Sequence, residues 1–278
     1  MFSSFLILIV AMFSIQAGAS FAKTLFPMVG PYGATSLRLF FASLILLLLW
    51  RPWKKIPTKN DFFHLGLYGG SLGLMNLCFY LALEKIPLGL AVTLEFCGPL
   101  TLSLILSKKP LDLIWAILAA LGVYLIYPEN SLTEGIDSLG VLFALAAGLF
   151  WALYIYFGQK TPKNISHSLV TCWGMIFAFL ISLPFGLGHF KEEVFTLNII
   201  PFALGVAILS SALPYSLEMI ALRKIPARTF GILMSLEPAF AILLGWIILH
   251  EKMTGIQLMA MTLIMFASVG SALNLKKN

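Results

Sequence analysis

Residues 210–245 read SSALPYSLEMIALRKIPARTFGILMSLEPAFAILLG, and the fold prediction starts from this stretch. Two apolar runs flank a short basic hinge at residues 223–226, and each run carries one glutamate, Glu218 or Glu237. Glu237 precedes Pro238 and lies well inside an apolar run. An ionisable side chain at bilayer depth costs roughly a few kcal/mol or more, so its presence there suggests a functional role.

The same design occurs earlier in the chain, between Ser71 and Pro99. The hinge there is Lys85-Ile86-Pro87, and Glu95 lies four residues before Pro99. An offset of 139 residues superimposes the two copies and pairs Ser71 with Ser210, Leu83 with Leu222, Lys85 with Lys224, Pro87 with Pro226, and Pro99 with Pro238. Five helices in each copy would insert the second copy in the opposite sense, as in the inverted repeats of many secondary transporters. The sequence therefore predicts two five-helix repeats, residues 1–130 and 131–278.

The composition is that of an integral membrane protein. Of 278 residues, 60% are hydrophobic and 11% are charged, whereas a soluble domain carries about 25% charged residues. The net charge of +6 is spread over short loops without interleaved aromatic residues, so no nucleic-acid partner is expected. The three cysteines lie inside apolar runs and are expected to be packing thiols. No histidine pair has metal-ligand spacing, and no metal or other cofactor is expected.

Ten runs are long enough to cross a bilayer, which takes roughly 20 mostly apolar residues. We expect an all-α membrane protein with spans at about 5–25, 32–50, 62–83, 87–106, 111–127, 138–158, 169–188, 199–221, 227–249 and 256–274. Residues 1–22 lack a basic start, so we interpret them as part of the first span and not as a signal peptide. Thirteen of the 18 basic residues fall in the even-numbered loops and the C-terminal tail. The positive-inside rule then places both termini in the cytoplasm.

Glu95 and Glu237 are the strongest candidates for chemistry. A carboxyl group removed from water can load and release a proton near neutral pH, so both are candidate proton-coupling residues. The alternative is a structural ion pair with Arg38, the one cation that lies away from the ends of a predicted span. Arg38 itself would suit a substrate carboxylate, or it could extend toward the outer interface. Glu218 is expected near the cytoplasmic end of its span, where a salt bridge with Arg223 is an equally good explanation.

Prolines within the predicted spans would leave backbone carbonyls without helical partners. Pro99 would free the carbonyl of Glu95, and Pro214 would free that of Ser210. Pro238 would do the same to the carbonyl of Met234. Such groups are tolerated at membrane depth where they line a wet cavity or are buried in protein, although each proline could equally be a structural kink.

Polar and aromatic side chains within the spans complete a candidate substrate site. Together with Arg38, Glu95 and Glu237, the predicted substrate-binding residues are Gln16, Asn76, Tyr80, Trp151, Tyr154, Ser211 and Tyr215. Small residues that would let helices approach closely are Gly66 with Gly70, Gly69 with Gly73, and Ala144 with Gly148.

Several stretches resemble the drug/metabolite transporter superfamily, in its ten-helix branch with two EamA-type repeats. They are residues 14–20 (SIQAGAS), 37–39 (LRL), 94–96 (LEF), 98–100 (GPL) and 207–239. The resemblance is closer to the inner-membrane exporters of threonine and homoserine. It implies export of small neutral amino acids across a bacterial inner membrane, driven by the proton gradient.

We therefore expect a transporter that alternates access between two halves, works in the lipid bilayer on a small molecule, and is a monomer or weak homo-oligomer. Other exported metabolites or drugs of the same superfamily are an alternative, as is a passive channel. A membrane-embedded enzyme is the remaining alternative. Aspartyl protease chemistry would need aspartates within the spans, but Asp61, Asp112 and Asp137 fall at loops or helix ends. A rhomboid-type serine protease motif with a membrane histidine is also missing from the sequence.

Overall fold

The computed structural model describes residues 2–54, 56–105, 112–126, 136–188, 199–224, 230, 234 and 236–274. Throughout these ranges the regular structure is helical, which confirms the all-α prediction. Five helices of the described part are long and apolar enough to cross a membrane, and three shorter apolar helices accompany them. Helices overlap all ten predicted ranges, while the count of ten spans stays a prediction.

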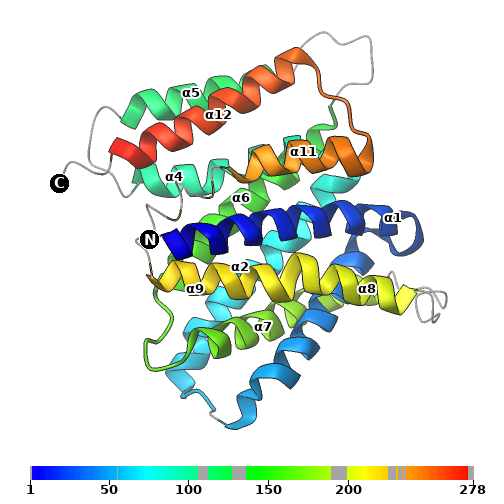
Figure 1. Ribbon diagram of the computed structural model, residues 1–278, viewed down its shortest axis with the longest axis vertical. Coiled ribbons are helices and arrows are strands. Elements are labelled where there is room, and N and C mark those ends of the chain that lie inside the picture. The colour runs from blue at the N-terminus through cyan, green and yellow to red at the C-terminus, as the bar shows by residue number, and fades with distance from the viewer. Residues whose placement is uncertain are drawn as a thin grey trace.

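The first two predicted spans are the two helical halves of α1 (Phe2–Trp50), which are joined at the non-helical residue Gly30, where the chain turns back. Gly30 has φ 64° and ψ 171°, a conformation that a residue without a Cβ adopts at little cost. Figure 1 shows the first half of α1 crossing the bundle and the second half returning from that turn. The start of α1 and the end of α12 (Gly255–Asn274) lie on the same side of the view.

Side-chain caps define the starts of three further helices. Thr58 and Asp61 form a reciprocal capping box at α2 (Lys59–Lys85), which satisfies backbone donors of the first turn. Asp137 caps α6 (Ser138–Gln159), and Ser166 caps α7 (His167–Leu187). Between α1 and α2 lies the short 3₁₀ turn η1 (Pro52–Lys54). The element α5 (Asp112–Ile126) packs along α12 at one edge of the bundle (Figure 1).

In the fourth predicted span the helix is interrupted near Pro99, where the sequence predicted a kink. That span is divided at Phe96 into α3 (Leu88–Glu95) and α4 (Cys97–Ile105). Pro99 lies in α4 and cannot donate to the carbonyl of Glu95, which weakens the helix at this point. The freed carbonyl faces α6, since a Cβ placed on Gly148 would lie 2.5 Å from it.

The eighth and ninth predicted spans also depart from simple helices. The eighth comprises α8 (Ile199–Ala207), the π-helical turn η3 (Ile208–Ala212) and α9 (Leu213–Lys224), with Pro214 directly after the π-turn. In the ninth, Leu236 forms a turn and Glu237 is the first residue of α11 (Glu237–Leu249), while Phe230 and Met234 before the turn are helical. Pro238 explains why α11 begins here, because its fixed φ and missing N–H suit the first turn of a helix.

Glycines mark the closest helix contacts in the bundle. On α2, a Cβ at Gly73 would lie 2.8 Å from the carbonyl oxygen of Ala178 on α7, and one at Gly69 would collide with Gly174. Gly66 and Gly70 have no such close neighbour, so only one of the two predicted glycine pairs on α2 lies against a backbone. The π-turn packs directly against α1 at Gly18, because a Cβ on this glycine would collide with Ser210.

Candidate functional site

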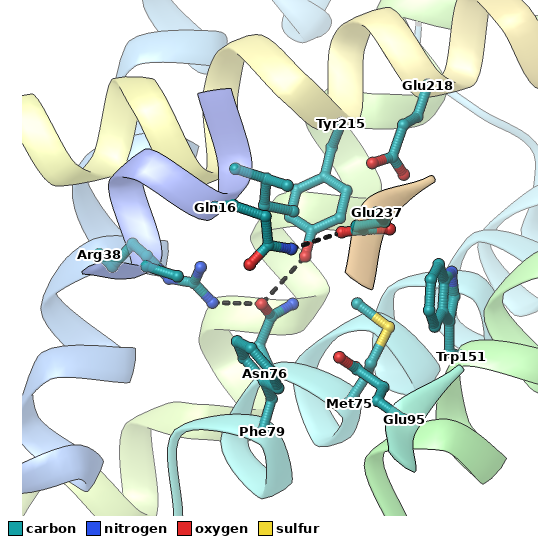
Figure 2. A pocket seen from close by; sticks show the side chains of 12 residues that line it. Gln16, Arg38, Met75, Asn76, Phe79, Glu95, Trp151, Tyr215, Glu218 and Glu237 are labelled. Carbon is teal, nitrogen blue, oxygen red and sulfur yellow. Dashed lines mark hydrogen bonds between the residues drawn. The ribbon is translucent and has the colours of Figure 1, made fainter. Parts of the chain in front are cut away.

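A polar cavity lies in the interior where α1, α2, α3, α6, α9 and α11 meet (Figure 2). The residues that line it are Ile15, Gln16, Ala19, Arg38, Met75, Asn76, Phe79, Glu95, Trp151, Tyr215, Glu218 and Glu237. The centre of a water molecule can move through about 30 Å³ of this space, which is room for about two ordered waters. An amino acid would therefore need the cavity to widen.

Arg38 lies inside the protein with 2% of its surface exposed. Its Nη2 donates to Asn76 Oδ1, and its Nη1 donates to the carbonyl oxygen of Ser210 at 3.3 Å. Its guanidinium carbon lies 4.3 Å from the centre of the Tyr80 ring, a cation–π contact. The Ser210 carbonyl is the one that Pro214 leaves without a helical donor. The structure thus places Arg38 at the cavity and not at the outer interface.

The side-chain oxygen of Asn76 accepts hydrogen bonds from two residues that line the cavity. Its Oδ1 accepts from Arg38 and, at 3.0 Å, from the hydroxyl of Tyr215, while its Nδ2 donates to the carbonyl oxygen of Leu72 at 2.7 Å. An amide oxygen has two lone pairs, so both acceptor positions of Asn76 are occupied. This geometry makes Asn76 the group that orients Arg38 and Tyr215.

Gln16 and Glu237 form a second polar group across the cavity from α1 to α11 (Figure 2). Gln16 Nε2 donates to Glu237 Oε1 at 2.7 Å, and the two side chains are 3% and 5% exposed. Gln16 Oε1 and Glu237 Oε2 are buried and have no hydrogen-bond partner among the described residues, and the same holds for Arg38 Nε. Unpaired buried polar atoms are costly, so a ligand or water that satisfied them would be favoured here.

Glu218 enters the same cavity from α9 and accepts a hydrogen bond from the hydroxyl of Tyr154 at 3.3 Å. It is 2% exposed. Tyr154 stacks on Tyr68 with ring centres 5.1 Å apart and contacts Tyr215 edge to face at 6.0 Å. Glu218 thus lines the cavity, a position that the sequence did not predict, while the side chain of Arg223, its predicted salt-bridge partner, lies outside the described residues.

The charge-bearing groups of the cavity are unequal in number. Three carboxyl groups, Glu95, Glu218 and Glu237, face one guanidinium, Arg38. Burying several like charges together is strongly unfavourable unless protons or cations neutralise them. Arg38 makes its hydrogen bonds with Asn76 and Ser210, so the cavity can offer carboxyl oxygens to a further cation.

Seven of the ten predicted site residues line the cavity: Gln16, Arg38, Asn76, Glu95, Trp151, Tyr215 and Glu237. The other three lie directly behind it. Tyr80 lies under Arg38, Tyr154 bonds to Glu218, and Ser211 is buried in the π-turn with no hydrogen-bond partner for its hydroxyl among the described residues.

Five lining residues were not predicted from the sequence, namely Ile15, Ala19, Met75, Phe79 and Glu218. Helical spacing could have identified most of them, since positions three apart share a helix face. Ala19 follows Gln16 by three residues, Phe79 follows Asn76 by three, and Glu218 follows Tyr215 by three.

Several membrane-length apolar helices around a buried polar cavity are typical of the class of multi-pass membrane proteins. A profile of the EamA-like transporter family matches residues 138–273. The "Threonine/homoserine exporter RhtA" of Escherichia coli K12 is 47% identical over 271 residues, which cover 98% of this chain and 92% of that protein. The protein of the same name from Salmonella typhimurium SL1344 is 46% identical over 272 residues, with the same coverage of both chains.

A more distant relative, an "Uncharacterized transporter" of Clostridium kluyveri, is 28% identical over 257 residues, covering 84% of this chain and 80% of that one. The chain belongs to the EamA-like transporter family, within the drug/metabolite transporter superfamily. The named relatives are exporters and transporters, so this is a transporter and not an enzyme.

Among the solved structures that match, a crystal structure covers 99% of both chains, with a TM-score of 0.64 and 17% sequence identity. At that identity the match supports the arrangement of the helices and carries no information on the substrate.

Proposed function

We propose that this protein exports small neutral amino acids of the threonine and homoserine type across a bacterial inner membrane. The observation that carries the proposal is the buried cavity, which sets one guanidinium opposite three carboxyl groups. A zwitterionic amino acid carries the two complementary charges. The 46–47% identity to threonine/homoserine exporters over nearly the whole chain favours this substrate class over other metabolites.

In this proposal the substrate carboxylate lies against Arg38, whose Nε has no partner among the described residues. A planar guanidinium recognises a carboxylate with two parallel hydrogen bonds. The substrate ammonium lies toward Glu237 Oε2 and the carboxyl group of Glu95. The remaining predicted site residues shape and support the space around it, namely Gln16, Asn76, Tyr80, Trp151, Tyr154, Ser211 and Tyr215.

The proposed cycle is alternating access between two five-helix halves, residues 1–130 and 131–278, coupled to protons at Glu95 and Glu237. The hydrogen bond between Asn76 and Tyr215 supports the two-repeat arrangement. These residues are 139 positions apart, which is the offset of the repeat. Equivalent positions touch each other where two repeats meet at a pseudo-two-fold axis, and substrate sites of inverted-repeat transporters lie near such axes.

The test is uptake of a panel of radiolabelled amino acids into proteoliposomes with an imposed pH gradient. We expect threonine and homoserine to be transported, with acceleration by the gradient and by unlabelled substrate on the opposite side. Transport of neither amino acid would overturn the substrate assignment. Transport without acceleration by unlabelled substrate would indicate a channel in place of a carrier.

A further inference from the structure

Charged side chains join four segments at the end of the bundle where α2 meets α3, α6 begins, and α11 connects to α12. The two ion pairs there are Lys23–Glu251, with 2.8 Å between Nζ and Oε1, and Lys85–Asp137, with 3.1 Å between Nζ and Oδ2. Each pair joins the first half of the chain to the second. In Figure 1 this end lies opposite the start of α1 and the end of α12.

In the first pair, each carboxylate oxygen of Glu251 accepts a hydrogen bond. Its Oε1 accepts from Lys23, and its Oε2 accepts from the backbone N–H of Leu88 at 2.8 Å. Lys23 Nζ also donates to the carbonyl oxygen of Ile86 at 3.2 Å. The Glu251 side chain is only 11% exposed, which makes these charge-assisted bonds stronger than those of an ordinary surface pair.

The backbone around Glu251 is shaped to hold the carboxylate. His250 ends α11 in the left-handed conformation, with φ 54° and ψ 28°, and turns the chain sharply. A Cβ placed on Gly245 would lie 2.7 Å from Glu251 Oε2. The carboxylate therefore occupies the space that any side chain at position 245 would fill.

The second ion pair, Lys85–Asp137, connects the hinge between α2 and α3 (residues 85–87) to the start of α6. Asp137 accepts from Lys85 and caps α6 through the N–H groups of Leu139 and Gly140. The hydrogen bond from Lys85 and the cap together hold the pKa of Asp137 below its ordinary value. Asp137 thus keeps its charge, and with it the ion pair, over a wide pH range.

The ion pair between Lys23 and Glu251 is separated from the cavity along two helices, α1 and α3. Lys23 follows Gln16 by seven residues on α1, and Leu88 precedes Glu95 by seven residues on α3. Seven residues are about two helical turns, or about 10 Å. The segments that run from the ion pair to the cavity carry buried apolar side chains of one packed cluster, namely Ala22, Leu83, Ile86, Leu88, Leu90, Ala91, Val92 and Leu94.

We propose that Glu251, Lys23 and the backbone of residues 86–88 form a gate that closes the cavity on this side of the membrane. We name this set the Glu251 gate. The proposal rests on the transport function proposed above. The apolar layer excludes water from the cavity, and the ion pair holds together the three segments that must separate before the layer can open. Breaking the Lys23–Glu251 pair then exposes the cavity to this side.

The experiment measures the accessibility of a cysteine placed in the apolar layer. Ala22 is fully buried and lies one turn beyond Ala19, which lines the cavity. The variant Ala22→Cys is made in a chain whose Cys78, Cys97 and Cys172 are replaced by alanine. A membrane-impermeant maleimide is added to the face that carries Glu251, with no amino acid present.

We expect slow labelling in this parent and about tenfold faster labelling with Glu251→Gln, since one charge-assisted pair is lost. Gly245→Ala should act in the same direction, because its Cβ displaces the carboxylate without removing a charge. The exchanged pair Lys23→Glu with Glu251→Lys restores the ion pair but loses the hydrogen bonds to the Leu88 N–H and the Ile86 carbonyl, so it should slow the labelling only in part. Glu84→Gln is the matched control, since Glu84 is an exposed carboxylate at the same end, and it should leave the rate unchanged.

Fast labelling of the parent, or equal rates in the parent, Glu251→Gln and Gly245→Ala, would overturn the gate. Melting temperatures of all variants in detergent establish that a changed rate is not unfolding. Because no substrate is present, the labelling result stands whether or not threonine is transported. Failure of the gate and failure of the proposed function are thus separate outcomes.

Discussion

At the scale of single residues, the polar side chains of the cavity differ in whether they keep hydrogen-bonding atoms without a partner among the described residues. Both acceptor positions of the Asn76 amide oxygen are filled, by Arg38 and Tyr215. Gln16 and Glu237 share one hydrogen bond and each keep one buried oxygen without a partner among the described residues. The atoms free to meet a substrate or a proton therefore include those on Gln16, Glu237 and Arg38, while Asn76 positions its neighbours.

Glu237→Gln removes the charge and retains a side chain of the same shape that can still bond to Gln16. If Glu237 exchanges protons during transport, this variant mimics its permanently protonated form. We expect it to exchange labelled for unlabelled threonine in proteoliposomes and to lose acceleration by a pH gradient. Glu84→Gln, at an exposed carboxylate, serves as the control and should behave as wild type. Wild-type acceleration in Glu237→Gln would remove Glu237 from the coupling mechanism.

At the scale of the elements, prolines and glycines place the helices around the cavity. Pro214 follows the π-turn and leaves the Ser210 carbonyl for Arg38. Pro238 puts Glu237 in the first turn of α11, where the free N–H groups of a helix start favour a carboxylate. Gly69 and Gly73 let α2 approach α7, which carries no cavity residue but supports the helix that presents Asn76.

The two glycine pairs of α2 give a matched test of this packing. Gly73→Ala would place a methyl group 2.8 Å from the carbonyl oxygen of Ala178, and we expect it to destabilise the protein by about 1–3 kcal/mol. At Gly70 the nearest atom is the end of the Ile181 side chain at 3.8 Å. Gly70→Ala should be neutral or stabilising by up to about 1 kcal/mol, because alanine favours the helix.

Thermal unfolding of the purified variants in the same detergent measures both effects. Equal melting temperatures for Gly70→Ala and Gly73→Ala would contradict the close α2–α7 contact.

At the scale of the whole molecule, the charges define an orientation. The basic residues concentrate in the loops predicted to be cytoplasmic. The ion pairs Lys23–Glu251 and Lys85–Asp137 lie in the loops predicted to face outward. With cytoplasmic termini, the Glu251 gate would close the cavity toward the outside, and an exported substrate would enter from the cytoplasm.

Reporter fusions test this orientation. A fusion at Asn278 should be active with a reporter that works in the cytoplasm and silent with one that works only in the periplasm, because the positive-inside rule retains basic loops inside. A second fusion in the 250–254 loop should show the opposite pattern. Periplasmic activity at Asn278 would reverse the orientation and place the Glu251 gate on the cytoplasmic side.

The sequence by itself determined the membrane class, the approximate helix ranges and most of the polar residues of the cavity. These are local properties: apolar run length sets a span, and a buried carboxyl or amide is visible in the chain as an interruption of that run. Tertiary structure alone decided that Glu218 faces the cavity, that Arg38 turns inward to Asn76, and that Gly69 and Gly73 form the glycine contact on α2. It also joined Lys23 to Glu251, 228 residues away. Partners so far apart are chosen by how the helices pack, and helical periodicity constrains a residue's face without naming the neighbour that covers it.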